Sequence, residues 1–230
     1  MRTKAFKAAF PHTLPVMAGY VFLGLGFGIL LASKGYYFLW SLFMSIIIYA
    51  GSMQYAAIDL LAGGAGFLYT AMMTLIIQVR HLFYGLSLIE KYKDAGKMKP
   101  LLMHELTDET YSLVCSCDPP EDVDPNLFYL FISMLDHSYW IVGCTIGTLL
   151  GSMVNFNTTG IDFVMTALFI VIFTNQWLES RDHRPALIGV ISSVICVVVF
   201  GPDNFIIPAM IAIAFILTVF RKSLEKEDKS

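Results

Sequence analysis

The chain has 230 residues, of which 57% are hydrophobic and 14% are charged, and its formal net charge is −3. Soluble domains carry about 25% charged residues, so this composition is too apolar for a surface that faces water. It indicates an all-α membrane protein, a polytopic bundle of transmembrane helices that forms one domain over residues 1–230. The small net charge also argues against a nucleic-acid partner.

Apolar runs long enough to cross a bilayer core of about 30 Å as helices recur along the chain. They predict spans over residues 14–32, 38–61 and 67–88, a polar connector over 90–126, spans over 127–150, 162–178, 186–200 and 204–220, and a charged tail over 222–230. The count is about seven spans. The last two are separated by a predicted helix break at Gly201, Pro202, Asp203 and Asn204, which is either an external loop or a kink at membrane depth.

The basic residues predict an orientation, because Lys and Arg are enriched in cytoplasmic loops. With seven spans and a cytoplasmic C-terminus, the inner side holds Lys34, Lys91, Lys93, Lys97, Lys99, Arg181 and Arg184. The same arrangement leaves Arg2, Lys4 and Lys7 outside. Either the N-terminus is an exception to the rule, or one span is miscounted.

An internal repeat is visible between residues 10–115 and 125–221. The glycines at 24 and 28 align with a second glycine series, and Gln54 aligns with Gln176. Three spans before the restart would give the halves opposite orientations, as in the inverted repeats of many secondary transporters; the alternative is chance similarity between apolar segments. The glycines are also spaced for close helix packing, which is the role that we expect for Gly24, Gly28, Gly143, Gly147 and Gly151.

Polar residues inside apolar spans are costly and therefore candidates for function. Gln78, Arg80 and His81 form one such group. The guanidinium of Arg80 is suited to hold a carboxylate, or else it reaches back to the membrane–water interface. The amides of Gln54, Asn175 and Gln176 are candidates for substrate binding, or for hydrogen bonds between helices.

Four further residues are candidates for proton coupling or gating: Asp108, Glu109, Asp136 and His137. A carboxylate beside an imidazole is suited to take up and release a proton. The alternatives are an interfacial belt around Tyr139 and Trp140 for the second pair, and helix capping for the first. His104-Glu105 opens like a metalloprotease motif, but Asp108 stands where the second zinc ligand belongs, so we expect no metal site and no enzyme.

Five motifs in order resemble the AzlC family of branched-chain amino acid permeases: Gly51-Ser52-Met53-Gln54, Arg80-His81-Leu82-Phe83-Tyr84-Gly85, Leu106-Thr107-Asp108-Glu109-Thr110, Tyr139-Trp140 with Gly143 and Gly147, and Gly201-Pro202-Asp203-Asn204. The resemblance implies a multi-pass protein of the bacterial cell membrane that exports branched-chain and other small apolar amino acids. It further implies a small AzlD-type membrane subunit as partner, energy from a proton or ion gradient, and no organic cofactor. The alternatives are a channel for small solutes and an assembly subunit that does not itself transport.

Overall fold

The computed structural model describes residues 2–153, 163, 166–167, 170, 173–174, 177–178, 182–201 and 205–227. All regular elements in these ranges are helices, so the all-α prediction is confirmed. The chain divides into two compact units, residues 1–165 and 166–230.

The first unit contains α1 (Arg2–Ser33), α2 (Phe38–Ile47), α3 (Gly51–Ala62), α4 (Phe67–Ser87), the 3-10 helix η1 (Lys93–Met98), α5 (Lys99–His104), α6 (Asp108–Ser116) and α7 (Pro125–Met153). In the described part of the chain, α1 and α7 are the two helices that are both long and apolar enough to cross a membrane. About seven spans are therefore not confirmed.

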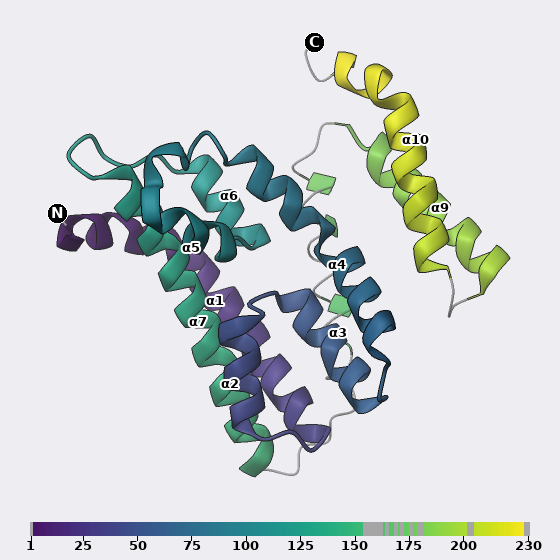
Figure 1. The fold of residues 1–230 in the computed structure, drawn as a ribbon, viewed down its shortest axis with the longest axis horizontal. Coiled ribbons are helices and arrows are strands. Elements are labelled where there is room, and N and C mark those ends of the chain that lie inside the picture. The colour runs from purple at the N-terminus through teal and green to yellow at the C-terminus, as the bar shows by residue number, and fades with distance from the viewer. Residues whose placement is uncertain are drawn as a thin grey trace. The chain divides into compact units, whose positions relative to one another are not determined.

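Helices α1 and α7 pack along each other at very short range through their glycines. Gly24 lies against the backbone of Gly143, and Gly28 lies against the backbone of Gly147. Both numbers rise together along the contact, so the two helices run in the same direction (Figure 1). Each is the first helix of one expected half, and an inverted repeat requires them to run in opposite directions. The inverted repeat is therefore not confirmed.

The second expected span, residues 38–61, is not one helix. It is interrupted between Ile47 and Gly51, where Tyr49 has a φ of 41°, in the left-handed region that non-glycine residues rarely adopt. Helices α2 and α3 have 10 and 12 residues, which gives lengths of about 15 and 18 Å, roughly half of a bilayer core.

The two short helices form a hairpin that returns to the end where it began. Along α2, Ser41 contacts Cys144 and the later Ser45 contacts the earlier His137, so α2 runs against α7. Along α3, the Tyr55 hydroxyl donates to the Leu23 carbonyl and Asp59 pairs with Lys34, so α3 runs with α1. The turn of the hairpin therefore lies in the interior of the unit (Figure 1).

This hairpin corrects the expected orientation. Helix α4 leads back to the end of the unit that holds the connector, and the Lys4 ammonium lies 2.9 Å from Asp122 of that connector. The N-terminus and the lysine-rich connector thus lie at one end, and Lys34 lies at the other end beside Asp59. The sequence left two explanations for the N-terminal cations, an exception to the positive-inside rule or a miscounted span. The structure favours the miscounted span, because residues 38–61 turn back inside the unit.

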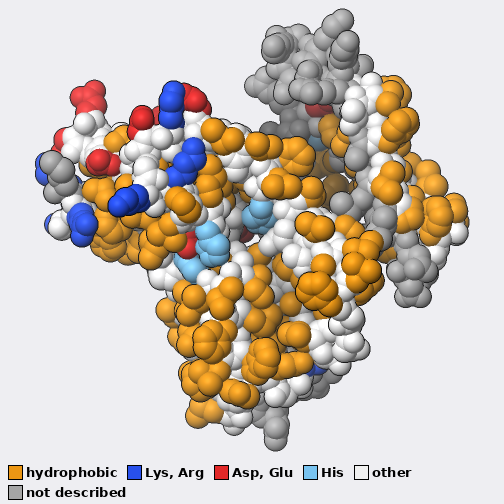
Figure 2. Space-filling view, viewed as in Figure 1, with side chains coloured by type: hydrophobic (Ala, Val, Ile, Leu, Met, Phe, Trp, Pro, Cys, Tyr) orange, Lys and Arg blue, Asp and Glu red, His pale blue; other side chains and the backbone are white. Residues whose placement is uncertain are grey.

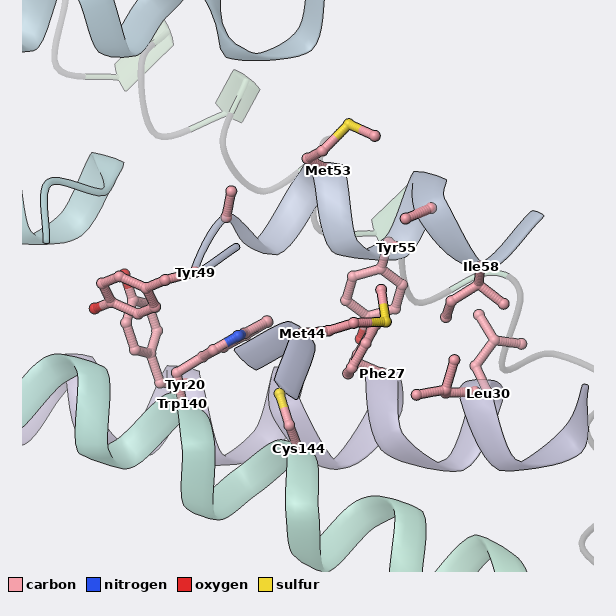
Figure 3. Close-up of a cluster of buried hydrophobic side chains, with 13 residues drawn as sticks. Tyr20, Phe27, Leu30, Met44, Tyr49, Met53, Tyr55, Ile58, Trp140 and Cys144 are labelled. Carbon is pink, nitrogen blue, oxygen red and sulfur yellow. The ribbon is translucent and has the colours of Figure 1, made fainter. Parts of the chain in front are cut away.

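Two apolar clusters hold the unit together. One lies between α1, α2, α3 and α7 and contains Phe27, Tyr55 and Ile58, each at most 1% exposed (Figure 3). The other, around Tyr92 and Phe128, packs the connector onto α7 and the start of α1. Outside these clusters α4 presents large apolar side chains, with Phe67 89% exposed and Leu75 71% exposed. Figure 2 shows such side chains over the visible body of the unit, while charged groups gather at the connector end.

The second unit contains α9 (Arg184–Phe200) and α10 (Ile206–Glu227), which pack against each other. Helix α9 ends before Gly201, whose φ of 79° suits glycine. The other residues of the expected helix break, Pro202, Asp203 and Asn204, lie outside the described residues.

Candidate functional site

Polar side chains converge in the first unit around the turn of the α2–α3 hairpin. The structure brings Gln54 of α3, Arg80 of α4, Asp108 and Glu109 of α6, and Asp136 and His137 of α7 to this region. Asn175 and Gln176 lie outside the described residues. Gln78 and His81 lie on α4 near Arg80, where Gln78 Oε1 and His81 Nδ1 are buried without a hydrogen-bond partner in the described structure.

Arg80 ties three helices together. One terminal nitrogen, Nη1, lies 2.7 Å from Asp108 Oδ2 on α6, and the other, Nη2, donates to the Ser52 hydroxyl on α3 at 2.7 Å. The Tyr84 hydroxyl donates to the second oxygen of Asp108 at 2.7 Å. The side chains of Arg80 and Asp108 are 30% and 24% exposed, so the pair is accessible and not sealed in the interior.

The N-terminus of α3 lies beside this pair. Its N-cap residue, Ala50, has no side chain that can accept from the first-turn amides, whose partial positive charge favours an anion. Gln54 is fully buried, and its Oε1 accepts from Trp140 Nε1 at 2.8 Å and from the Ala50 amide at 3.3 Å. Its Nε2 has no partner among the described residues. This end of α3 therefore offers hydrogen-bond donors.

The C-terminus of α2 faces two histidines. His137 Nε2 donates to the Ser45 carbonyl at 2.9 Å, and His137 Nδ1 lies 2.7 Å from Glu105 Oε2. His104 Nε2 lies 3.2 Å from the Ile47 carbonyl. The ring of Tyr49 stacks on His137 with a centroid distance of 4.0 Å. His137 is thus paired with Glu105 and not with its sequence neighbour Asp136.

Asp136 belongs to a separate buried network. Its Oδ2 accepts from the Thr110 hydroxyl at 2.9 Å, and Thr110 in turn accepts from Thr107 at 3.0 Å. Tyr20 on α1 contacts Thr107 and donates to Glu109 at 2.8 Å. Burial raises the pKa of Glu109 above its ordinary value, although the hydrogen bond from Tyr20 opposes this shift. Hydroxyl groups thus connect two carboxyl groups on α6 and α7.

An apolar cavity of about 580 Å³ lies between α2, α3 and α4. It is lined by Trp40, Met44, Ile48, Met53, Ala57, Leu60, Leu61, Gly64, Ala65, Thr70 and Thr74. Met53 follows Ser52 directly, so the cavity begins next to the donors at the α3 N-terminus. A volume of this size is typical of a site for a small ligand.

Sequence reasoning did not single out Ser52, Tyr49, Trp140 or Glu105 as members of the site. In the sequence, Glu105 stands out only as part of a metalloprotease-like pair, and Trp140 only as an interfacial residue. The useful signal for Glu105 was its charge within a run that also holds Leu101, Leu102 and Leu106. A carboxylate among leucines needs a buried partner.

Comparison with known proteins gives a consistent family. The model of the AzlC protein family matches residues 15–154, which include all of the site described above. The chain is 45% identical to the branched-chain amino acid transport protein AzlC of Bacillus subtilis, over 98% of this chain and 89% of that protein. It is 41% identical to an uncharacterized membrane protein of Helicobacter pylori, over 96% of this chain and 97% of that protein. It is 27% identical to the inner membrane protein YgaZ of Escherichia coli, over 82% of this chain and 81% of that protein.

No solved structure matches the chain. The family match covers more than half of its length, and the Bacillus relative matches nearly all of it. The resemblance seen in the five sequence motifs is therefore confirmed, and the chain belongs to the AzlC protein family.

Proposed function

We propose that this chain is the transporting subunit of an exporter for branched-chain amino acids in a bacterial cell membrane. The name of the Bacillus relative supports the substrate class. In this proposal a proton or ion gradient drives export, and a small AzlD-type subunit completes the transporter. The orientation follows the positive-inside rule, with the N-terminus and the connector lysines on the cytoplasmic side, and the C-terminus cytoplasmic as well.

One observation carries the proposal. The break between α2 and α3 lies beside a group of hydrogen-bond donors and also beside an apolar cavity. A branched-chain amino acid needs an anion site, an ammonium site and an apolar pocket. Arg80, Ser52 and the first turn of α3 supply donors for the carboxylate, and the cavity at Met53 and Ala57 takes the side chain. Interrupted helices are used in this way in secondary transporters. For the ammonium group we propose Asp136 together with the side chain of Gln54.

Arg80 already holds a carboxylate in this structure, that of Asp108. Substrate would therefore exchange with Asp108 and would not enter an unpaired guanidinium site. This exchange links substrate binding to α6, because release of Asp108 also loosens the contact between α4 and α6. Asp108 and Glu109 are thereby proposed as gating residues, with His81 and Gln78 as neighbours on α4.

The test is transport of radiolabelled valine by the chain and its small partner, copurified and reconstituted in liposomes. A charge-assisted hydrogen bond contributes about 1.5–3 kcal/mol, so Arg80→Ala should raise the KM for valine roughly 10- to 100-fold. Lys93→Ala is the matched control, because it also removes one cation but from an exposed pair with Glu90, and it should leave KM unchanged. Transport by Arg80→Ala at the wild-type rate and KM would contradict the proposed carboxylate site. Flux that does not saturate and shows no counter-transport would indicate a channel.

A further inference from the structure

The C-terminal end of α2 carries a protonatable contact that the proposed substrate site does not use. Helix α2 stops inside the unit, so its last carbonyls need donors that its own backbone does not supply. His137 Nε2 contacts the Ser45 carbonyl at 2.9 Å, and His104 Nε2 contacts the Ile47 carbonyl at 3.2 Å. A ring nitrogen that faces a carbonyl oxygen must carry the hydrogen. The negative end of the helix dipole also favours a cation at this place.

The second ring nitrogen of each histidine faces the same carboxyl group. Glu105 Oε2 lies 2.7 Å from His137 Nδ1, and Glu105 Oε1 lies 3.4 Å from His104 Nδ1. The Glu105 side chain is 3% exposed and the His137 side chain is 10% exposed, so water does not separate them freely.

Proton counting distinguishes this contact from an ordinary hydrogen bond. Glu105 Oε2 accepts no directed hydrogen bond in the described structure, so its 2.7 Å contact with His137 Nδ1 is an ion pair. Because His137 Nε2 already donates to Ser45, the imidazole attracts Glu105 only when Nδ1 also carries a proton. Loss of that proton would place the lone pair of a neutral imidazole against a carboxylate oxygen. The contact is therefore attractive only while the pair holds the proton.

We infer that Glu105 and His137 together bind the coupling proton, and that its release detaches the C-terminal end of α2. The inference rests on the proposed gradient-driven transport and names the group that carries the proton. It replaces the expected pair of Asp136 and His137, because Asp136 points to Thr110.

Other titratable groups lie nearby. The rings of His104 on α5 and Tyr49 at the hairpin turn lie beside His137. Asp136 is its neighbour on α7, and Glu109 on α6 belongs to the same hydroxyl network as Asp136. Each of the two carboxyl groups in this set accepts a hydrogen bond from a hydroxyl group. The tyrosine ring covers one face of His137. Glu105 is the carboxyl group that directly contacts His137.

The position of the pair explains how a proton would affect substrate. Ile48, Tyr49 and Ala50 are the three residues between α2 and α3. The proton site holds the last turn of α2, and the proposed carboxylate site is the first turn of α3. Movement of the last turn of α2 also displaces the first turn of α3, because only three residues join them. Proton release and substrate release are therefore linked through the hairpin turn.

The first experiment reads the hairpin itself, without transport. Hydrogen exchange of the segment over residues 44–53, corrected for the intrinsic pH dependence, is followed in the copurified complex from mildly acidic to mildly alkaline pH. In the wild type, protection should fall about tenfold or more as the pair loses its proton. Glu105→Gln and His137→Gln should each abolish this pH dependence, whereas the exposed carboxylate variant Glu90→Gln should keep it. Wild-type protection that does not change with pH would overturn the inference.

The second experiment uses radiolabelled leucine in liposomes. Glu105→Gln should lose accumulation against a pH gradient but keep exchange of labelled for unlabelled leucine, because exchange requires no net proton release. Gradient-driven accumulation at the wild-type level in Glu105→Gln would overturn the inference. If the wild type moves no leucine in either mode, the proposed function fails, and the hydrogen-exchange result still decides whether the pair is a proton switch.

Discussion

The closest contact between α1 and α7 gives a sharp prediction for the substitution Gly28→Ala. A Cβ built at Gly28 would lie 2.3 Å from the Cys144 carbonyl oxygen and 2.3 Å from the Thr148 nitrogen. Ordinary contacts of a Cβ begin at 3.4 Å, so the two helices would have to separate by about 1 Å. Both neighbours are backbone atoms, so no side chain can turn away to relieve the contact.

The energetic terms can be compared directly. Overpacking of a well-packed contact costs about 1–3 kcal/mol, while replacing glycine by alanine within a helix gains up to about 1 kcal/mol. Because both atoms that Gly28→Ala would meet belong to the backbone, its cost lies in the upper part of this range, about 2–3 kcal/mol, and the net loss is about 1–2 kcal/mol. Gly19→Ala is the control on the same helix, because a Cβ there would meet nothing within 4 Å. This variant should be as stable as the wild type or slightly more stable.

Thermal unfolding in detergent, followed by fluorescence-detected size exclusion, measures the difference. A loss of 1 kcal/mol lowers the Tm of a protein of this size by about 2–4 °C. We expect Gly28→Ala to melt about 2–8 °C below the wild type. If Gly28→Ala melts at or above the Tm of Gly19→Ala, the close approach of α1 and α7 is wrong.

Three further predictions concern charge, selectivity and orientation. Because burial raises the pKa of Glu109, its contribution to the free energy of unfolding is present at low pH and is lost as pH rises through that pKa. Glu109→Gln should flatten this decline, measured by chemical denaturation at a series of pH values. An unchanged decline would contradict the prediction. Ala57→Leu narrows the cavity, so the KM for transport of leucine should rise more than the KM for alanine. Equal rises in the two KM values would show that the cavity does not bind the substrate side chain. In a cysteine-free background, Lys4→Cys and Lys34→Cys should react with an impermeant thiol reagent from opposite sides of the membrane, and labelling from one side would contradict the hairpin.

The overall class could be predicted from the sequence because composition alone excludes a water-facing surface. The helix interruption near Tyr49 could not, because residues 38–61 form an apolar run without proline, and the break depends on tertiary contacts of Tyr49 and Gln54. The error in orientation followed from this one segment. A run of 24 residues satisfies the length of a span whether it crosses the bilayer or folds back on itself.

The sequence indicated most residues of the candidate site, but it did not indicate which of them contact each other. Asp136 and His137 are adjacent in sequence, but successive residues of a helix point about 100° apart. They therefore face different segments, α6 for Asp136, and α2 and the turn after α5 for His137. Glu105 could not be assigned to His137 in advance, because Glu105 lies in the turn after α5 and His137 lies on α7, and the sequence does not reveal how these segments pack.

The shortness of α2 and α3 also bears on how the protein is made. A translocon releases segments into lipid according to their apolar length. Helices α1 and α7 have 32 and 29 residues, whereas the two helices of the hairpin have only 10 and 12. Neither piece can satisfy its terminal backbone groups in lipid alone. The hairpin must therefore settle into place after α1 and α7 have met, which makes the assembled core a template for the last stage of biogenesis.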